Sequence, residues 1–206
     1  MIQLYGLRLS NYYSLTKALL IEKGLAFEEV KAPPTQDEDN LRRTPMGKMP
    51  SIGVDGRYLS ESLAIASYLE RLQPEPALLP ADPFAAAKVV ELCCHLKLDV
   101  ELVARRCLPE AFFGQTVSDE VKETTQADLV KGMRAVDRLM VCEPYAAGAE
   151  LTLADFYTFY TFSLANGISQ AIFAEDLLTD HANIRALIER LAEHPSIAQV
   201  EADKAG

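Results

Sequence analysis

Glu61 and Ser62 are the residues whose types and spacing point most directly to binding chemistry. They open an apolar-periodic segment, residues 61–72, and would therefore stand at the N-terminus of a helix. A helix N-terminus presents unpaired N–H groups and a partial positive charge, so it binds a carboxylate well. Ser62 could add a hydroxyl donor, and Glu61 could accept from an ammonium group. The simpler alternative is that Ser60 or Ser62 only caps the helix and Glu61 is a first-turn charge.

The other reactive residue types have simpler interpretations. Arg105 and Arg106 form a basic pair that could bind an acidic or carbonyl substrate. They could equally lie on a solvated face, with Glu101 paired to Arg105 one turn away. The four cysteines form no CxxC motif and have no histidine at zinc-ligand spacing, so we expect reduced thiols and no metal site.

Composition excludes several functional classes. The chain has 206 residues, of which 49% are hydrophobic and 24% charged, which is typical of a globular protein with a core of its own. Lys and Arg number 20 against 30 Asp and Glu, giving a net charge of −10. Such a chain repels phosphate backbones and anionic membranes, so we expect no nucleic-acid or membrane partner. With no signal peptide or membrane span visible, we expect a cytoplasmic protein.

The elements that must position these residues change in type along the chain. Apolar patterns predict a βαβ unit followed by ββα, with a tight hairpin at Asp55-Gly56. The expected strands are 2–5, 26–31, 51–54 and 57–59, and the expected helices are 12–23 and 61–72. Four prolines between residues 73 and 83 predict a linker. Beyond it the pattern predicts only helices: a long one through 89–103, then 118–141, 152–165, 182–192 and 196–203. We expect an α/β domain at 1–75, a linker at 76–83 and an all-helical domain at 84–206.

Three segments, in this order, resemble the cytosolic glutathione transferase family, and most closely its bacterial, serine-type members. The segments are the first helix start at Ser10, then Gly47-Lys48-Met49-Pro50-Ser51-Ile52 with Asp55-Gly56 and Glu61-Ser62, and then Thr152-Leu153-Ala154-Asp155. The resemblance covers essentially the whole chain. It implies a thioredoxin-like first domain, glutathione as co-substrate without a further cofactor, and a homodimer. It also implies that Thr152-x-x-Asp155 is a structural helix cap.

The resemblance assigns a glutathione site to Lys48, Met49, Pro50, Glu61 and Ser62. In this family the peptide bond before the proline is cis, which turns the Met49 backbone toward the cysteinyl backbone of the tripeptide. Glu61 and Ser62 would hold the ammonium and carboxylate of the γ-glutamyl end. Lys48 is better placed than Arg42 or Arg43 for the glycine carboxylate.

Ser10 is the expected catalytic residue. A free thiol has a pKa near 8.5, and a hydroxyl donor beside the sulfur at a helix N-terminus lowers it. Lowering that pKa by about two corresponds to roughly 2.7 kcal/mol. Counted back from Glu22-Lys23-Gly24, Ser10 falls on the catalytic serine of the serine-type members. Tyr12, Ser14 and Tyr5 stay open as alternatives.

The resemblance implies transfer of glutathione to a small hydrophobic electrophile. The residues expected to line the second-substrate pocket are Arg8, Leu9, Tyr12, Tyr13, Arg105, Arg106, Phe112 and Tyr157. The apolar helix at 89–103 is expected to form the two-fold seam of the dimer. Two alternatives stay open: a noncatalytic binding or regulatory protein of the same fold, and a glutathione-dependent peroxidase or isomerase.

Overall fold

The computed structural model describes residues 1–205 and divides the chain into two units. The first unit combines Met1–Leu78 with the segment from Glu193 onward, and the second is Leu79–Ala192. The last helix groups with the first unit, whereas we expected it within a domain at 84–206. Among residues 1–205, no helix has both the length and the apolar character needed to cross a membrane.

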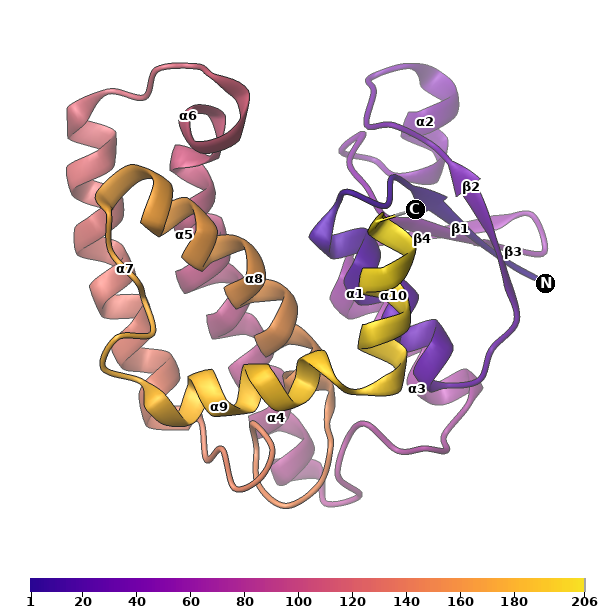
Figure 1. The fold of residues 1–206 in the computed structure, drawn as a ribbon. Helices are drawn as coiled ribbons and strands as arrows, with labels where there is room; N and C mark the ends of the chain where they lie inside the picture. The colour runs from indigo at the N-terminus through magenta and orange to yellow at the C-terminus, as the bar shows by residue number, and fades with distance from the viewer. Residues whose placement is uncertain (206) are drawn as a thin grey trace. The chain divides into compact units, whose positions relative to one another are not determined.

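The first unit is built on a four-stranded sheet in the order β2-β1-β3-β4 (Figure 1). Its elements are β1 (Ile2–Gly6), α1 (Asn11–Glu22), β2 (Phe27–Lys31), α2 (Glu38–Arg43), β3 (Ser51–Val54), β4 (Arg57–Ser60), α3 (Ser62–Leu72) and α10 (Pro195–Ala205). β1 runs parallel to β2 and antiparallel to β3, and β3 runs antiparallel to β4. The predicted βαβ–ββα order is confirmed, as is the hairpin, whose two turn residues Asp55 and Gly56 both have positive φ.

The strand register brings three chain segments to one end of the sheet. Tyr5 in β1 pairs with Ser51 at the start of β3, and Ser51 pairs in turn with Ser60 at the end of β4. The loop after β1, the residue before β3 and the segment after β4 therefore leave the sheet together. This end of the sheet also carries the N-termini of α1 and α3.

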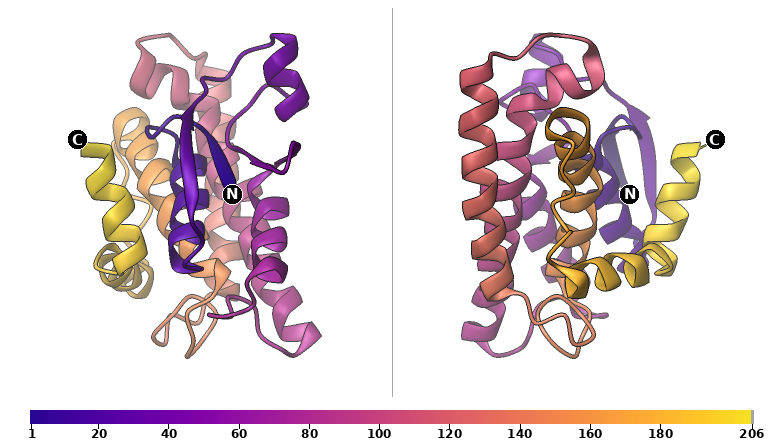
Figure 2. Two further views of the ribbon diagram at one scale, coloured as in Figure 1. Left: turned by 90° about the vertical axis from the view of Figure 1, so that its right-hand side faces the viewer. Right: turned by 60° about the vertical axis from the view of Figure 1, so that its left-hand side comes forward.

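The two faces of the sheet are covered by different helices. Ile2 and Leu4 are buried on the face of α1, where a Cβ added to Gly6 would lie 2.5 Å from the Tyr13 ring. Glycine at position 6 is what allows α1 to pack this closely. Tyr5 points to the opposite face, where the Arg43 guanidinium of α2 lies 5.3 Å from the centre of its ring. α1 also packs against α3 and α10, and the views in Figures 1 and 2 agree that α10 lies beside α1.

The second unit is helical. Its elements are α4 (Pro83–His95), the π-helical turn η1 (Leu96–Glu101), α5 (Leu102–Ala104), the 3-10 turn η2 (Arg105–Cys107), α6 (Leu108–Phe113), α7 (Asp119–Leu139), α8 (Leu153–Phe173) and α9 (Ala182–Ala192). The expected long helix at 89–103 is thus interrupted by η1. Where η1 faces α7, a Cβ on Gly132 would overlap the Asp99 carbonyl, so only glycine fits there without a shift.

The apolar stripe of α4 and η1 belongs to the core of this unit. Val89, Cys93, Leu96 and Val100 are all buried within it. The buried side chains of this stripe are covered by α7 and α8, so a dimer seam on this run of helix would have to use its exposed residues instead.

Thr152 and Asp155 form the predicted capping box at the start of α8, with the Thr152 N–H donating to Asp155 Oδ2 at 2.7 Å. Asp155 also accepts from the Ala146 N–H at 2.7 Å, so it ties the preceding loop to the helix.

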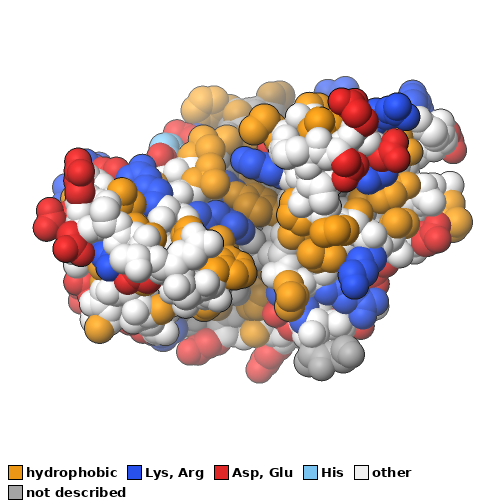
Figure 3. Space-filling view, turned by 90° about the horizontal axis from the view of Figure 1, so that it is seen from above, with side chains coloured by type: hydrophobic (Ala, Val, Ile, Leu, Met, Phe, Trp, Pro, Cys, Tyr) orange, Lys and Arg blue, Asp and Glu red, His pale blue; other side chains and the backbone are white. Residues whose placement is uncertain are grey.

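Over the visible surface of each unit, hydrophobic and charged side chains are interspersed (Figure 3).

Candidate active site

Ser10 is the N-cap residue of α1. Its N–H donates to the Leu7 carbonyl at 3.0 Å, which closes the turn after β1. Its carbonyl accepts from the Ser14 N–H at 2.9 Å, and its Oγ accepts from the Tyr13 N–H at 3.4 Å. Because Oγ acts as the acceptor in that bond, the hydroxyl proton is left to donate. A half-buried hydroxyl at a helix N-terminus is suited to stabilise an anion.

Two of the alternative hydroxyl donors are already engaged. Ser14 is fully buried, and its hydroxyl donates to the Arg8 carbonyl. The Tyr5 hydroxyl donates to Gln3 Oε1 at 2.8 Å on the face of α2, and burial raises the pKa of Tyr5 above its usual value. Tyr12 is half-buried, and Thr16 donates to its carbonyl.

Met49 and Pro50 precede β3 at the same end of the sheet, and the bond between them is cis, as the resemblance implied. Pro50 is buried, Met49 is half-buried and Lys48 is exposed. Gly47 before them has φ +64, and a Cβ there would overlap the Thr35 carbonyl. The backbone of the loop at Thr35 thus packs directly against the approach to β3.

Glu61 and Ser62 follow β4 at this end. Ser62 is the first residue of α3, and Glu61 is its N-cap residue with φ 69 and ψ 118. A positive φ in a non-glycine residue costs on the order of 1–3 kcal/mol and is concentrated at functional sites. The Glu61 side chain makes no capping bond and is exposed. Its carboxylate is therefore available to a ligand, whereas a simple capping role would have used it.

In the first unit, the residues expected in the second-substrate pocket separate into two groups. Leu9 is strongly exposed, whereas Tyr13 is buried. The Tyr13 hydroxyl donates to Glu29 at 2.6 Å, and burial raises the pKa of Tyr13 far above its usual value. Arg8 directs its Nε and an Nη toward the same carboxylate at 3.1 and 2.8 Å. Tyr13 is therefore a core residue, contrary to our expectation, and Arg8 is part of an ion-pair cluster.

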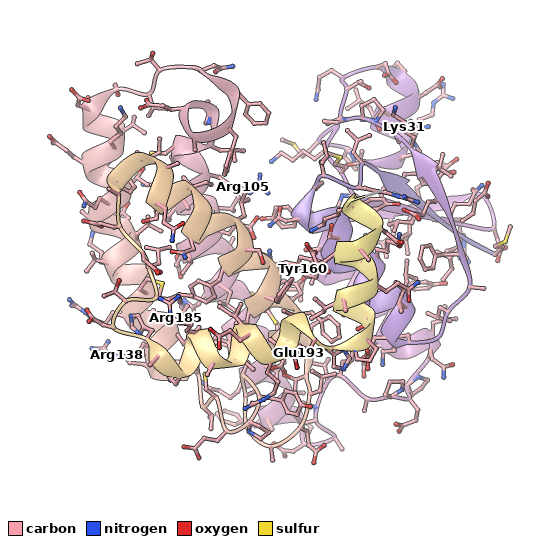
Figure 4. The ribbon with its side chains drawn as sticks, in the orientation of Figure 1. Lys31, Arg105, Arg138, Tyr160, Arg185 and Glu193 are labelled. Atoms are coloured by element: carbon pink, nitrogen blue, oxygen red, sulfur yellow. The ribbon has the colours of Figure 1, made fainter. Side chains whose placement is uncertain are left out.

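In the second unit, Tyr157 is only 1% exposed and lies in the core, so the expectation that it lines a pocket is wrong. Arg105, labelled in Figure 4, donates from Nε to the buried Glu101 at 2.8 Å. Arg106 donates to Asp128 at 2.8 Å. Both arginines thus have carboxylate partners, while the Phe112 ring is exposed.

Sequence reasoning missed a charge cluster beneath α1. Glu29 on β2 accepts from Arg8, from the Tyr13 hydroxyl and from Lys17 Nζ at 2.8 Å. Lys17 also pairs with Asp203 of α10 at 2.5 Å. The partners lie up to 186 residues apart in sequence, so no local pattern could have revealed them.

Comparisons with known proteins agree over both units. A family model described as "Glutathione S-transferase, N-terminal domain" matches residues 4–77, and one described as "Glutathione S-transferase, C-terminal domain" matches residues 109–204. A protein of Pseudomonas putida named glutathione S-transferase is 41% identical over 204 residues, covering 99% of this chain and 93% of the relative.

Solved structures agree with this fold. Glutathione transferase F2 from Populus trichocarpa has a TM-score of 0.82 at 20% identity, over 100% of both chains. A maleyl pyruvate isomerase described as a bacterial glutathione S-transferase of Zeta class has a TM-score of 0.75 at 24% identity, over 96% of this chain and 95% of the other. At these identities the likeness concerns the fold alone.

Proposed function

Because the chain belongs to the glutathione S-transferase family of enzymes, we propose that the end of the sheet with Ser10, Met49-Pro50 and Glu61-Ser62 binds glutathione and that Ser10 holds its sulfur as the thiolate. The observation that carries this proposal is the register Tyr5–Ser51–Ser60, which gathers all three segments at that end. No single one of them has enough donors and acceptors for a tripeptide.

Each part of glutathione has a partner of matching chemistry. The exposed Glu61 carboxylate accepts from the γ-glutamyl ammonium, and Ser62 with the N-terminus of α3 donates to the carboxylate on the same carbon. The Met49 backbone pairs with the cysteinyl backbone as an added strand would. Lys48 is exposed and is assigned to the glycine carboxylate. The cysteinyl sulfur then lies at the N-terminus of α1.

Ser10 and the helix together supply enough energy to ionise the thiol. A hydrogen bond to a charged group contributes about 1.5–3 kcal/mol, and a helix N-terminus about 0.3–1 kcal/mol. Their sum, about 2–4 kcal/mol, lowers a thiol pKa of about 8.5 by roughly two. The bound sulfur is then largely thiolate at neutral pH.

The thiolate lone pair attacks an electrophilic carbon of the second substrate. A carbon–sulfur bond forms, and the electron pair leaves with a departing anion or moves onto the substrate, where solvent protonates it. We assign a small hydrophobic electrophile to this step, with Leu9 and Tyr12 beside Ser10 as candidates to contact it. The strongly exposed apolar side chain of Leu9 supports this choice.

The test is calorimetric titration of glutathione into the wild-type chain, Ser10→Ala and the control Ser67→Ala, which removes an exposed hydroxyl from α3. The ultraviolet absorbance of the thiolate is followed in parallel from about pH 5 to about pH 9, around the ordinary thiol pKa. We expect similar affinity in all three. We expect the bound-thiol pKa to rise by about one to two in Ser10→Ala alone, which corresponds to the loss of one charge-assisted hydrogen bond.

Other outcomes distinguish the alternatives. Binding without a thiolate in the wild-type chain means a retained site without catalysis, that is, a binding or regulatory protein. A thiolate that survives Ser10→Ala but disappears in Tyr12→Phe moves the catalytic role to Tyr12. Absence of binding in the wild-type chain refutes the proposal as a whole.

We further propose a homodimer in a cytoplasmic setting. The core stripe of α4 and η1 is covered, but Phe84, Leu98 and Leu102 are large apolar side chains that stay exposed on the same run of helix. Leu98 and Leu102 are four residues apart, and contiguous exposed apolar residues mark association surfaces. Sedimentation of wild type and Leu98→Glu tests this proposal, with a monomeric mass expected for the variant and a dimeric mass for the wild type.

A further inference from the structure

The loop between β1 and α1, residues 7–10, is held mainly through Arg8. The Arg8 carbonyl accepts from the Ser14 hydroxyl at 3.4 Å. The Arg8 guanidinium donates two hydrogen bonds to Glu29, at 2.8 and 3.1 Å. Ser10 closes the same loop through its N–H bond to Leu7. A displacement of the Arg8 side chain would therefore move the turn that carries Ser10.

Glu29 anchors Arg8, and its two oxygens accept four hydrogen bonds from three residues. Oε1 accepts from Arg8 and from Lys17 Nζ, both at 2.8 Å. Oε2 accepts from Arg8 Nε and from the Tyr13 hydroxyl. Two cations therefore share Oε1. The strength of the interaction between Lys17 and Oε1 depends on the other groups that Lys17 contacts.

Asp203 of α10 is that other contact. Lys17 is only 4% exposed and lies between the carboxylates of Glu29 and Asp203, at 2.8 and 2.5 Å. The cluster thus contains two cations, Arg8 and Lys17, and two anions. An Arg8 Nη also donates to the Asp203 backbone carbonyl at 3.3 Å. Without the Asp203 charge, the buried ammonium of Lys17 has only Glu29 as a carboxylate partner in this cluster, and it would draw that carboxylate away from Arg8.

We propose that Asp203 and Lys17 are positioning residues for the active-site loop, so that the last helix of the chain sets where Ser10 lies relative to the bound sulfur. The inference rests on the proposed function, since it assigns α10 a role in the reaction at Ser10. Neither residue is among those assigned to the glutathione site. Their effect passes through Glu29 and Arg8 to the loop backbone, and a misplacement of about 1 Å in such a loop is enough to lower a rate markedly.

The experiment compares wild type, Asp203→Asn, Asp203→Glu and the control Glu201→Gln in the full chain. Glu201 lies on the same helix and pairs with Lys204 at 2.6 Å, so its substitution removes the same charge outside the cluster. Three quantities are measured: the affinity for glutathione, the pKa of the bound thiol from its thiolate absorbance, and kcat/KM with a generic aryl electrophile.

We expect Asp203→Asn to change the affinity by less than about twofold, because Glu61, Ser62 and Met49 lie on other elements. We expect it to raise the bound-thiol pKa by about 0.5–1, which lowers kcat/KM about three- to tenfold below that pKa. Asp203→Glu should keep the bound-thiol pKa and kcat/KM close to their wild-type values, and Glu201→Gln should behave like wild type.

An equal thiol pKa in wild type and Asp203→Asn overturns the inference while leaving the role of Ser10 intact, even if Asp203→Asn lowers the melting temperature. Equal pKa increases in Asp203→Asn and Glu201→Gln overturn it as well, because they would reflect net charge only. A wild-type chain that binds glutathione without forming a thiolate refutes the proposed function and this inference together.

Discussion

Lys23 offers a quantitative test of how the first unit is held together, because its ammonium is buried and has three acceptors. Its side chain is 1% exposed, and Nζ lies 2.6 Å from Glu70, 2.6 Å from the Pro76 carbonyl and 3.5 Å from the Pro74 carbonyl. Glu70 uses its other oxygen to accept from the Leu78 N–H at 2.9 Å. The Lys23–Glu70 ion pair and its hydrogen bonds therefore connect the end of α1, α3 and the segment at residues 74–78.

The perturbation is Lys23→Met, which keeps most of the methylene packing and removes the charge. Removing one partner of a buried ion pair costs about 3–5 kcal/mol. Glu70 is 17% exposed and keeps its bond to Leu78, so water can compensate in part, and we expect the lower end, about 3 kcal/mol. For a chain of this length that corresponds to a melting temperature lower by roughly 6–12 °C.

Differential scanning calorimetry and denaturant unfolding followed by circular dichroism measure the effect. Lys31→Met is the matched control, because Lys31, labelled in Figure 4, is exposed on β2. The double variant Lys23→Met/Glu70→Gln should recover about half of the loss, since no uncompensated charge stays buried. A cost below about 1 kcal/mol for Lys23→Met, or no recovery in the double variant, would refute the reasoning.

Three further outcomes follow from contacts described above. The pKa of Glu29 is lowered from 4.5 to about 2, because hydrogen bonds from Arg8, Lys17 and Tyr13 outweigh the opposing effect of burial. The ionised carboxylate therefore stabilises the folded state above about pH 4.5. This stabilisation is lost as the pH falls toward 2. Acid titration should show Glu29→Gln lacking about 1–2 kcal/mol of this pH-dependent stability, a value reduced for partial solvent screening. Glu61→Gly should raise the stability by about 1 kcal/mol by relieving the positive φ, while glutathione titration shows weaker binding. Gly132→Ala should cost about 2 kcal/mol in denaturant unfolding, because its Cβ meets the Asp99 backbone, whereas Gly114→Ala has open space around it and only a φ penalty.

Local signals predicted the first unit well. The Asp55-Gly56 turn signal between two short strand segments located β3, β4 and their turn, and these fix the register that gathers the candidate site. Thr152 and Asp155 were recognisable as a cap because both partners lie within four residues. Spacing of this kind is visible in a single sequence, since the interacting groups are neighbours on one element.

Long-range chemistry could not be predicted in the same way. Tyr13 reads as a pocket residue beside Ser10 until its partner Glu29, on another strand, is known. Tyr157 likewise looks available at the start of a helix, yet α8 is surrounded closely enough to bury it. η1 also has no sequence signal of its own, because the 3.6-residue pattern of apolar positions continues through Leu96 and Val100.

The placement of α10 has a consequence for how the protein is made. In chain order, the second unit is an insertion between α3 and α10 of the first. A ribosome therefore releases Asp203, the partner of Lys17, only after the whole helical unit has been synthesised. Until then the N-terminal 78 residues carry an incomplete charge cluster and an uncovered face of α1. Moving the segment from Glu193 onward ahead of Met1 by circular permutation would make the first unit continuous and let it complete itself before the helical unit is translated.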